Sequence, residues 1–263
     1  DSYNSAFGFN AGGGLTTGLF NTLIGALAGD ALTDADRNVA IGSGALSTDT
    51  LGSKSIAIGQ AALFTQNFTT ATDTFNVAVG HEAGTAVTTG TYNTLVGGLT
   101  GDAITTGIEN VFIGGQAGTS LIDGDHNIAV GKAALFSDTK GSRSTAVGHG
   151  VFSTQNFGTS VNSYNTGLGY KAGESVTTGI ENTLIGGLAG DAITDADYNI
   201  AVGKGSLGTN QLGSRNTAVG TNSLHIANPA TAVDTYNTAL GYDAGYAVTT
   251  GIQNTFIGAL SGD

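Results

Sequence analysis

A five-residue peptide recurs along this chain at nearly constant spacing, and this repeat constrains the fold more than any other feature. It consists of Asn or Ser, then Thr, Val, Ile or Ser, then a small or apolar residue, then a large apolar residue, then Gly. The spacing is 17 residues except for three steps of 21. The glycines are Gly8, Gly25, Gly42, Gly59, Gly80, Gly97, Gly114, Gly131, Gly148, Gly169, Gly186, Gly203, Gly220, Gly241 and Gly258. A unit this short cannot bury a core alone, so it must pack against its neighbours.

The repeated peptide has the composition of a short β-strand. We number each unit from its Asn or Ser as position 1, so that the glycine is position 5. Position 4 is always large and apolar and is mostly β-branched, as in Ile24 and Val202. β-Branched residues bounded by Gly and turn residues favour a strand. Coils stacked at the ~4.8 Å strand spacing form a solenoid, and fifteen would extend roughly 70 Å.

These features predict an all-β fold, a parallel β-solenoid or β-roll of 17-residue coils. Glycine is abundant, with 44 residues of 263, which agrees with a repetitive β-rich chain. Residues 1–263 are expected to form one array of fifteen coils. Because the chain begins and ends inside the pattern, we interpret it as a fragment of a longer fibre protein.

The second half of each unit shows two compensating patterns. Where position 9 is Gly, position 12 is apolar, as in the unit with Gly29 and Leu32. Where position 9 is Leu or Phe, position 12 is polar in the shorter units, as with Leu46 and Asp49. We infer two coil types that fill a similar core volume from different points on the perimeter.

Position 3 is expected to carry the contact between chains. Strand side chains alternate between faces, so if position 4 points into the coil, position 3 points out of it. Position 3 is never polar, and a strand that is apolar on both faces is normally covered on both. The sequence therefore predicts self-association through the largest residues of this column. These are Leu23, Leu95, Phe112, Leu184 and Phe256.

The repeat resembles two groups of known sequences. The units "NTAVG", "NVAIG" and "NIAVG" are similar to the head repeats of trimeric autotransporter adhesins, which form a parallel β-roll and associate as trimers. The stretches "YNTGLGYKAG" at 164–173, "YNTALGYDAG" at 236–245 and "RNVAIGSGAL" at 37–46 resemble more closely the shaft repeats of bacteriophage tail fibres and tailspikes. The resemblance covers essentially the whole chain.

This resemblance implies a homotrimer, either intertwined or side by side. It implies an extracellular segment of a virion tail fibre or spike that takes part in host attachment, with a host cell-surface glycan or protein as partner. The alternative is the head of a bacterial trimeric autotransporter-type adhesin at the cell surface. A glycan-degrading tailspike is a third reading.

Composition argues against several other classes. Eight Lys and Arg against twenty Asp and Glu give a net charge of −12, which disfavours nucleic acid because such binding depends on positive charge. No apolar run approaches the roughly 20 residues that span a bilayer, so membrane insertion is not expected. The chain contains no Cys, which excludes disulfides and thiolate metal sites.

The segment from Gly203 to Gly208 has the G-x-G-x-x-G spacing of a dinucleotide-binding turn. That fingerprint requires a following helix and an acidic residue about 20 positions further on. The next residues, "TNQLGSRNTAVG", do not suit a helix, and no acidic residue occurs between Asp197 and Asp234. The histidines also fall at different coil positions. We therefore expect no cofactor and no catalytic residues, so the chain is not expected to be an enzyme, although a carboxylate pair between subunits stays open.

Three aspartate-rich turns match the start of a D-x-D-x-N calcium loop. They lack the glycine at loop position six and the glutamate at position twelve. Turn chemistry is the favoured interpretation, because Asp side chains accept backbone hydrogen bonds in bends. A calcium site would need further ligands from a neighbouring coil or chain. The candidate ligands are Asp34, Asp36, Asp123, Asp125, Asp195 and Asp197.

The three longer coils, "TQNFTTATDTFN", "TQNFGTSVNSYN" and "IANPATAVDTYN", each insert four residues before an aromatic residue. Insertions in solenoids map to one face, often the binding face, so Phe68, Phe157 and Pro229 are candidate receptor contacts. The alternative, which we favour, is that the insertions latch adjacent subunits or correct accumulated twist. The Asn or Ser at position 1 is expected to form a structural ladder that satisfies backbone groups.

Overall fold

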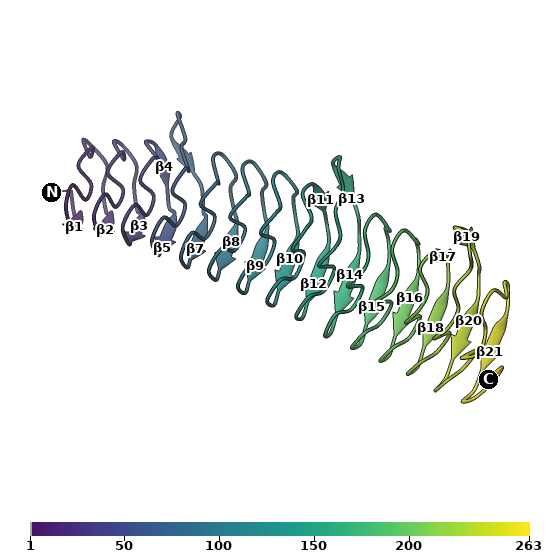
Figure 1. The fold of residues 1–263 in the computed structure, drawn as a ribbon. Helices are drawn as coiled ribbons and strands as arrows, with labels where there is room; N and C mark the ends of the chain where they lie inside the picture. Colours follow the sequence, from purple (N-terminus) through teal and green to yellow (C-terminus); the bar gives the residue numbers. More distant parts are fainter. Residues whose placement is uncertain (1) are drawn as a thin grey trace. The chain divides into compact units, whose positions relative to one another are not determined.

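The computed structural model describes residues 2–263. These residues form two compact units, 2–127 and 128–263, and each unit is a stack of the predicted coils. Figure 1 shows the coils of each unit following one another, with one short strand per coil on a common side. The prediction of a parallel β-solenoid with a repeat of about 17 residues is confirmed.

In the first unit, each coil contributes one three-residue strand to a parallel sheet. The pairing is in register, so that Ala6 lies opposite Leu23 and Leu95 lies opposite Phe112. The strands are β1 (Ser5–Phe7), β2 (Thr22–Ile24), β3 (Val39–Ile41), β5 (Ile56–Ile58), β7 (Val77–Val79), β8 (Thr94–Val96) and β9 (Val111–Ile113).

The second unit repeats this arrangement. Its strands also pair in parallel and in register, with Leu184 opposite Ala201, for example. They are β10 (Ile128–Val130), β12 (Thr145–Val147), β14 (Thr166–Leu168), β15 (Thr183–Ile185), β16 (Ile200–Val202), β18 (Thr217–Val219), β20 (Thr238–Leu240) and β21 (Thr255–Ile257).

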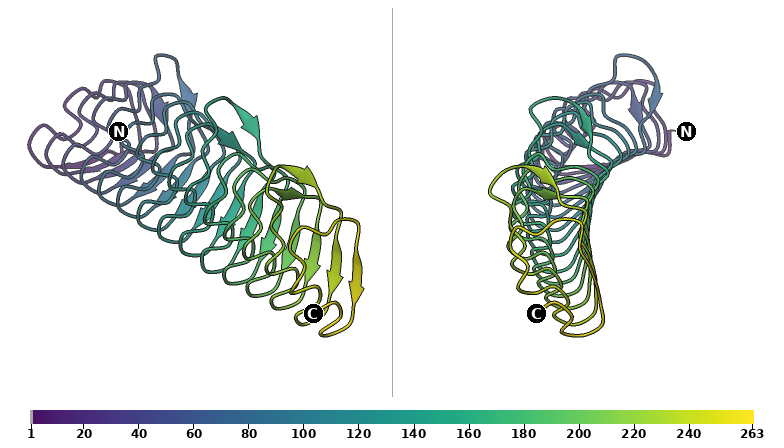
Figure 2. Two further views of the ribbon diagram at one scale, coloured as in Figure 1. Left: turned by 45° about the vertical axis from the view of Figure 1, so that its right-hand side comes forward. Right: turned by 90° about the vertical axis from the view of Figure 1, so that its right-hand side faces the viewer.

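Each longer coil adds a small parallel ladder outside the main sheet. β4 (Gly52–Ser53) pairs with β6 (Thr72–Asp73) in the first unit. In the second unit, β11 (Gly141–Ser142) pairs with β13 (Val161–Asn162), and β17 (Gly213–Ser214) pairs with β19 (Val233–Asp234). Figure 2 shows these segments rising above the walls formed by the shorter coils.

The position-5 glycine is required by the close approach of successive coils. Gly186 has a φ of +134°, and a Cβ placed on it would lie 2.6 Å from the carbonyl carbon of Gly203 in the next coil. The backbone itself is the obstacle, so no side-chain movement could relieve the overlap. Glycine is therefore needed both for its conformation and for the contact between coils.

The side chains of the strand point in the directions opposite to those predicted from the sequence. Position 3 points into the coil: Leu23, Leu95, Phe112 and Leu184 are each 0 % exposed within a single chain, and Phe256 in the last strand is half-buried. Position 4, which was expected to fill the core, is exposed or half-buried. The prediction that position 3 forms the contact between chains is wrong for Leu23, Leu95, Phe112 and Leu184, because their side chains are enclosed by their own coils. Phe256 points the same way, since a Cβ on Gly262 would lie 3.2 Å from its Cζ.

Positions 3 and 9 share the same core volume. A Cβ on Gly29 would lie 2.8 Å from Leu23 Cδ2, so a large residue at position 3 leaves no room at position 9. Leu or Phe at position 9 occurs only with Ala at position 3, as in Ala40 with Leu46 and Ala201 with Leu207, and these leucines are fully buried. The two predicted coil types are confirmed, and the structure adds position 3 to the compensation.

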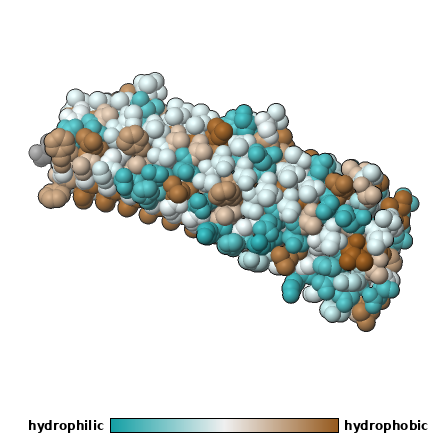
Figure 3. Space-filling model, in the orientation of Figure 1, coloured by the Kyte–Doolittle hydropathy of each residue, from teal (hydrophilic) through white to brown (hydrophobic). Residues whose placement is uncertain are grey.

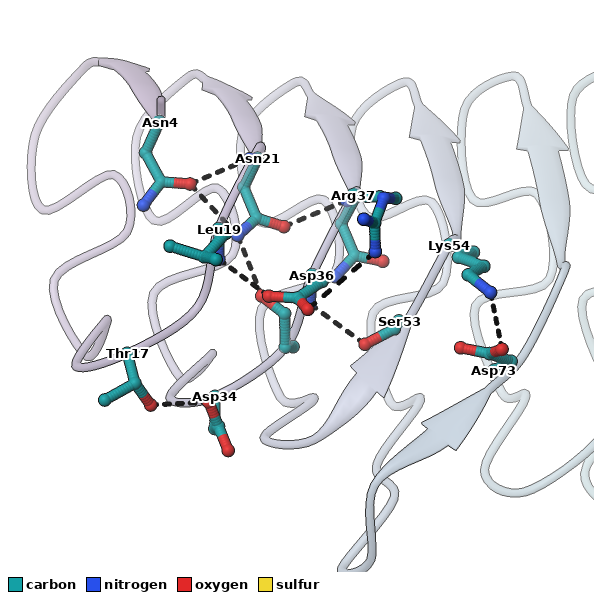
Figure 4. A network of polar contacts seen from close by, with 12 residues as sticks. Asn4, Thr17, Leu19, Asn21, Asp34, Asp36, Arg37, Ser53, Lys54 and Asp73 are labelled. Carbon is teal, nitrogen blue, oxygen red and sulfur yellow. Dashed lines mark hydrogen bonds and ion pairs between the residues drawn. The ribbon is translucent and has the colours of Figure 1, made fainter. Parts of the chain in front are cut away.

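The position-1 residues form the predicted ladder between coils. The Oδ1 of Asn4 accepts a hydrogen bond of 2.8 Å from the backbone N–H of Asn21, and Asn21 Oδ1 accepts one of 2.9 Å from Asn38 (Figure 4). The Nδ2 of Asn38 donates to the Gly52 carbonyl at 2.9 Å. Buried amides thus satisfy backbone groups that the short strands leave without partners.

Residues 2–263 contain no α-helix. Accordingly, none of the described segments is a helix that is long and apolar enough to cross a membrane.

Candidate binding surfaces

The outer face of the sheet is an apolar surface. We define the strand face as the side chains at positions 2 and 4, which point away from the core on each strand. Ile113 is 41 % exposed in the first unit, and Leu168 is 48 % exposed in the second. Figure 3 shows hydrophobic side chains at regular intervals along the margin of the first unit where the strands lie. A parallel sheet normally has both faces covered, so this surface is unusual for an isolated chain.

A row of aromatic and charged side chains borders the strand face. It consists of the residue before each position 1, which has a φ of about +50 to +64° in every coil. The Tyr3 and Phe20 rings are stacked at 5.2 Å, and Phe75 and Tyr92 are stacked at the same distance. In these two pairs, each ring presents its face to the ring of the neighbouring coil. Flat ligands bind aromatic residues by stacking on their ring faces, and in these pairs the neighbouring ring occupies those faces. This packing favours a role in coil stacking over a role in ligand binding.

The basic members of this row hold the longer coils in place. The Nζ of Lys54 lies 2.5 Å from Asp73 Oδ2, and Figure 4 shows this pair at the base of β6. The Nε of Arg215 donates to Asp234 Oδ2 at 2.9 Å, at the equivalent place in β19. Arg215 also lies over the Tyr236 ring, with Cζ 5.9 Å from its centroid. The insertions are thus tied to their own chain.

The predicted receptor contacts in the longer coils are buried. Phe68 is 7 % exposed, Phe157 is 4 % exposed, and Pro229 is also buried. A Cβ on Gly141 would lie 2.9 Å from Phe157 Cδ2, and one on Gly213 would lie 3.2 Å from Pro229 Cδ. These side chains fill the widened core where the chain detours, so the assignment of all three as receptor contacts is wrong. The exposed residues of the insertions include Thr69 and Thr159 instead.

A buried polar network supports two of the longer coils. In the second unit, Asp138 Oδ1 accepts a hydrogen bond of 3.0 Å from the Gly141 N–H, and Asp138 Oδ2 accepts one of 2.6 Å from Gln155 Nε2. Gln155 Nε2 also donates to Ser144 Oγ, and Gln155 Oε1 accepts from Asn165 Nδ2. Burial raises the pKa of Asp138 above its usual value, and the hydrogen bonds from Gln155 and the backbone oppose that rise.

The third longer coil replaces this network with a different set of residues. Asn210 stands where Asp138 stands in the earlier coil, and its side chain both accepts from the Gly213 N–H and donates to the Gly213 carbonyl. Ala227 stands in place of Gln155, and Asn216 in place of Ser144. The three positions change together because a buried donor needs a matching acceptor. We assign the network a structural role.

The aspartate-rich turns bond to the preceding coil. Asp36 Oδ1 accepts a hydrogen bond of 2.7 Å from the Leu19 N–H, as Figure 4 shows. The same bond joins Asp125 to Ile108 at 2.9 Å and Asp197 to Ile180 at 2.8 Å. Within residues 2–263, no three His, Asp or Glu side chains are grouped so that they could hold a metal ion. Asp34 and Asp195 likewise accept hydrogen bonds from Thr17 and Thr178. Hydrogen bonding between coils therefore explains these carboxylates. The structure does not place Asp123 in a group of metal ligands.

The segment from Gly203 to Gly208 is covered by a side chain of the next coil. The Nδ1 of His225 lies 2.7 Å from the Gly205 carbonyl oxygen, and a Cβ on Gly208 would lie 2.6 Å from His225 Cε1. The glycines make room for this ring, which stacks on Tyr246 at 5.4 Å. No pocket occurs in the part of the chain that the structure describes.

Comparisons with models of protein families, with curated proteins and with solved structures gave no match.

Proposed function

We propose that the chain is a structural segment of an extracellular fibre, in the form of a homotrimer. The fibre is a bacteriophage tail fibre or spike that extends from the virion and takes part in contact with the host surface. Its surface partner is a glycan or protein of the host cell.

The continuous bonding between coils is the observation that carries this proposal. Within each unit, successive coils bond through their strands, and most also bond through the position-1 ladder. The turns add further bonds, as between Asp197 and Ile180. At Ser55 and Ser144 the ladder is replaced by bonds to Thr74 and Ser163. The core is filled by alternating large residues at positions 3 and 9. A filled cross-section in which the strands of successive coils are hydrogen-bonded suits a spacer that transmits force along its length.

The repeats themselves connect this architecture to fibres. Stretches such as "YNTALGYDAG" at 236–245 resemble tail-fibre shaft repeats. The adhesin head is the second candidate, because units such as "NVAIG" at 38–42 also resemble its repeats. The sequence flanking the chain separates the two: a tail-attachment region or chaperone domain favours the fibre, and a C-terminal membrane anchor favours the adhesin.

Immunogold labelling of the phage particles or bacterial cells that carry this protein tests the proposal directly. Antibodies raised against residues 1–263 are expected to label the tails of phage particles. Labelling of bacterial envelopes alone would replace the fibre with the adhesin. Incubation with host polysaccharide is expected to release no new reducing ends, and sustained release would instead favour the glycan-degrading spike.

A further inference from the structure

We infer that the strand face is the surface on which a second copy of this chain packs. This inference rests on the proposed homotrimer. The sequence prediction placed the contact at position 3, whereas the structure puts positions 2 and 4 on the outer face of the strand. The occupant is another copy of the same solenoid, with its own strand face turned toward the first.

The chemistry of the strand face is that of an interface core. Position 4 is a large apolar residue in every coil, and position 2 is Thr, Val, Ile or, once, Ser. None of the chain's 28 Asp, Glu, Lys and Arg residues occurs in either column. Charged and aromatic side chains border the columns instead, including Glu109 and Tyr198. An apolar centre with a polar rim is the usual anatomy of a protein interface.

The area of the strand face in each unit can be compared with the area that known interfaces bury. At ~4.8 Å per strand and about 7 Å between columns, with side-chain width added, each unit offers roughly 400 Å². Stable interfaces bury about 800 Å² per partner. Each unit thus supplies about half of a standard interface, and already reaches the size of the largest patch on a typical monomer, roughly 300–600 Å².

The spacing of the columns favours a β-sheet as the partner, and a second copy of this chain supplies one whose exposed face has the same apolar side chains. The ridges of the strand face repeat at the ~4.8 Å strand spacing, and a surface that interdigitates with them must have the same repeat. Another copy of this chain meets that condition at every coil. An α-helix rises 1.5 Å per residue with a 5.4 Å pitch, which does not match the columns. An anionic membrane surface is disfavoured by the net charge of −12.

The first experiment compares paired charge substitutions by sedimentation equilibrium. Val96→Glu with Ile185→Glu places one carboxylate on the strand face of each unit. Thr89→Glu with Thr250→Glu is the matched control, since both threonines are exposed at position 14, away from the strands. We expect the wild type and the control to assemble. The strand-face variant should associate at least about a hundredfold more weakly, because an unpaired buried charge is costly.

The outcomes separate the two proposals. If the strand-face variant assembles like the wild type, the inference is overturned and the homotrimer stands on another surface. If the wild type itself is monomeric at about 100 µM, the homotrimer fails, and the inference fails with it. Circular dichroism must show that the variants keep the β-spectrum of the wild type.

A second experiment does not depend on the charged variants folding. The chain has no Cys, so a single Val96→Cys can be labelled with a maleimide without background. Its labelling rate should fall at least tenfold in the assembled protein relative to a diluted, dissociated sample. Thr89→Cys should label equally fast in both. Equal rates for Val96→Cys in the two states would overturn the inference.

Discussion

The ring of Phe112 occupies the space that a side chain on Gly118 would need. A Cβ on Gly118 would lie 2.5 Å from Phe112 Cδ2 and 2.7 Å from Cζ. Gly118 has a φ of +58°, close to the +51° of Leu135 at the same coil position. The position-9 backbone therefore accepts either Gly or Leu, and a large residue at position 3 excludes Leu.

A double-mutant cycle on this pair tests the shared core volume. Phe112→Ala should lower the free energy of unfolding by about 3–5 kcal/mol because it leaves a cavity. Gly118→Leu alone should destabilise by overpacking, by about 1–3 kcal/mol. Together they restore the Ala–Leu pairing of positions 3 and 9, so the double variant should be more stable than the sum predicts by at least about 1 kcal/mol. Urea unfolding followed by circular dichroism measures each term, and strict additivity would contradict the shared volume.

The position-5 glycine should be far less tolerant inside the stack than at its end. Gly186→Ala places a Cβ 2.6 Å from the Gly203 backbone, so the coils must separate locally. Gly258→Ala is the control, because its φ is +115° and nothing lies within 4 Å of its Cβ position. We expect a loss of several kcal/mol for Gly186→Ala and about 1 kcal/mol of backbone strain for Gly258→Ala. Equal losses of thermal stability would show that conformation alone requires the glycine.

The buried carboxyl of Asp138 should make stability fall as pH rises. Burial raises its pKa above 3.8, so the folded chain holds this proton more tightly than the unfolded chain does. As the pH rises, the unfolded chain therefore loses this proton first. The stability that the bound proton supplies is complete below about pH 4 and is lost as the pH rises through the raised pKa of the folded chain. Asp138→Asn with Gln155→Ala copies two of the three residues of the third longer coil, Asn210 and Ala227, and removes the titrating group. As the pH rises from 4 to 7, the free energy of unfolding of the wild type should fall relative to that of the double variant.

The single substitutions serve as controls for this network. In Asp138→Asn alone, the new amide N–H would face Gln155 Nε2, which is also a donor, so two buried donors would meet. This variant should be less stable at pH 7 than the double variant. The opposite order would contradict the assigned hydrogen-bond network.

The aspartate turns should act through hydrogen bonds and not through a metal. Asp197→Ala removes the acceptor for the Ile180 N–H and should cost about 1 kcal/mol of unfolding free energy. Asp197→Asn keeps an acceptor oxygen and should cost less. Thermal unfolding in EDTA and in millimolar calcium should give the same midpoint. A rise with calcium that is lost in Asp197→Asn would restore the metal interpretation.

Much of the architecture follows from the sequence because its signals are local. The 17-residue spacing defines the coil, β-branched residues define the strand, and Gly186 and its equivalents mark each corner. The position-1 ladder was also predictable, because a buried Asn at the same place in successive coils can bond only to its neighbours or to nearby backbone. The exchange of Gly and Leu at position 9 indicated two ways of filling one core.

The tertiary structure alone decided which face of the strand is inside. Alternation separates Leu184 from Ile185, but both residues are apolar, so the pattern gives no sign of which one is buried. The same ambiguity placed Phe68 and Phe157 on the surface, because an insertion predicts a detour of the backbone and not the direction of its side chains. One signal was present: Leu or Phe at position 3 occurs only with Gly at position 9, as in Leu184 with Gly190. That exclusion is a contact between side chains across the core, and it becomes a physical constraint only when the coil closes and brings the two positions together.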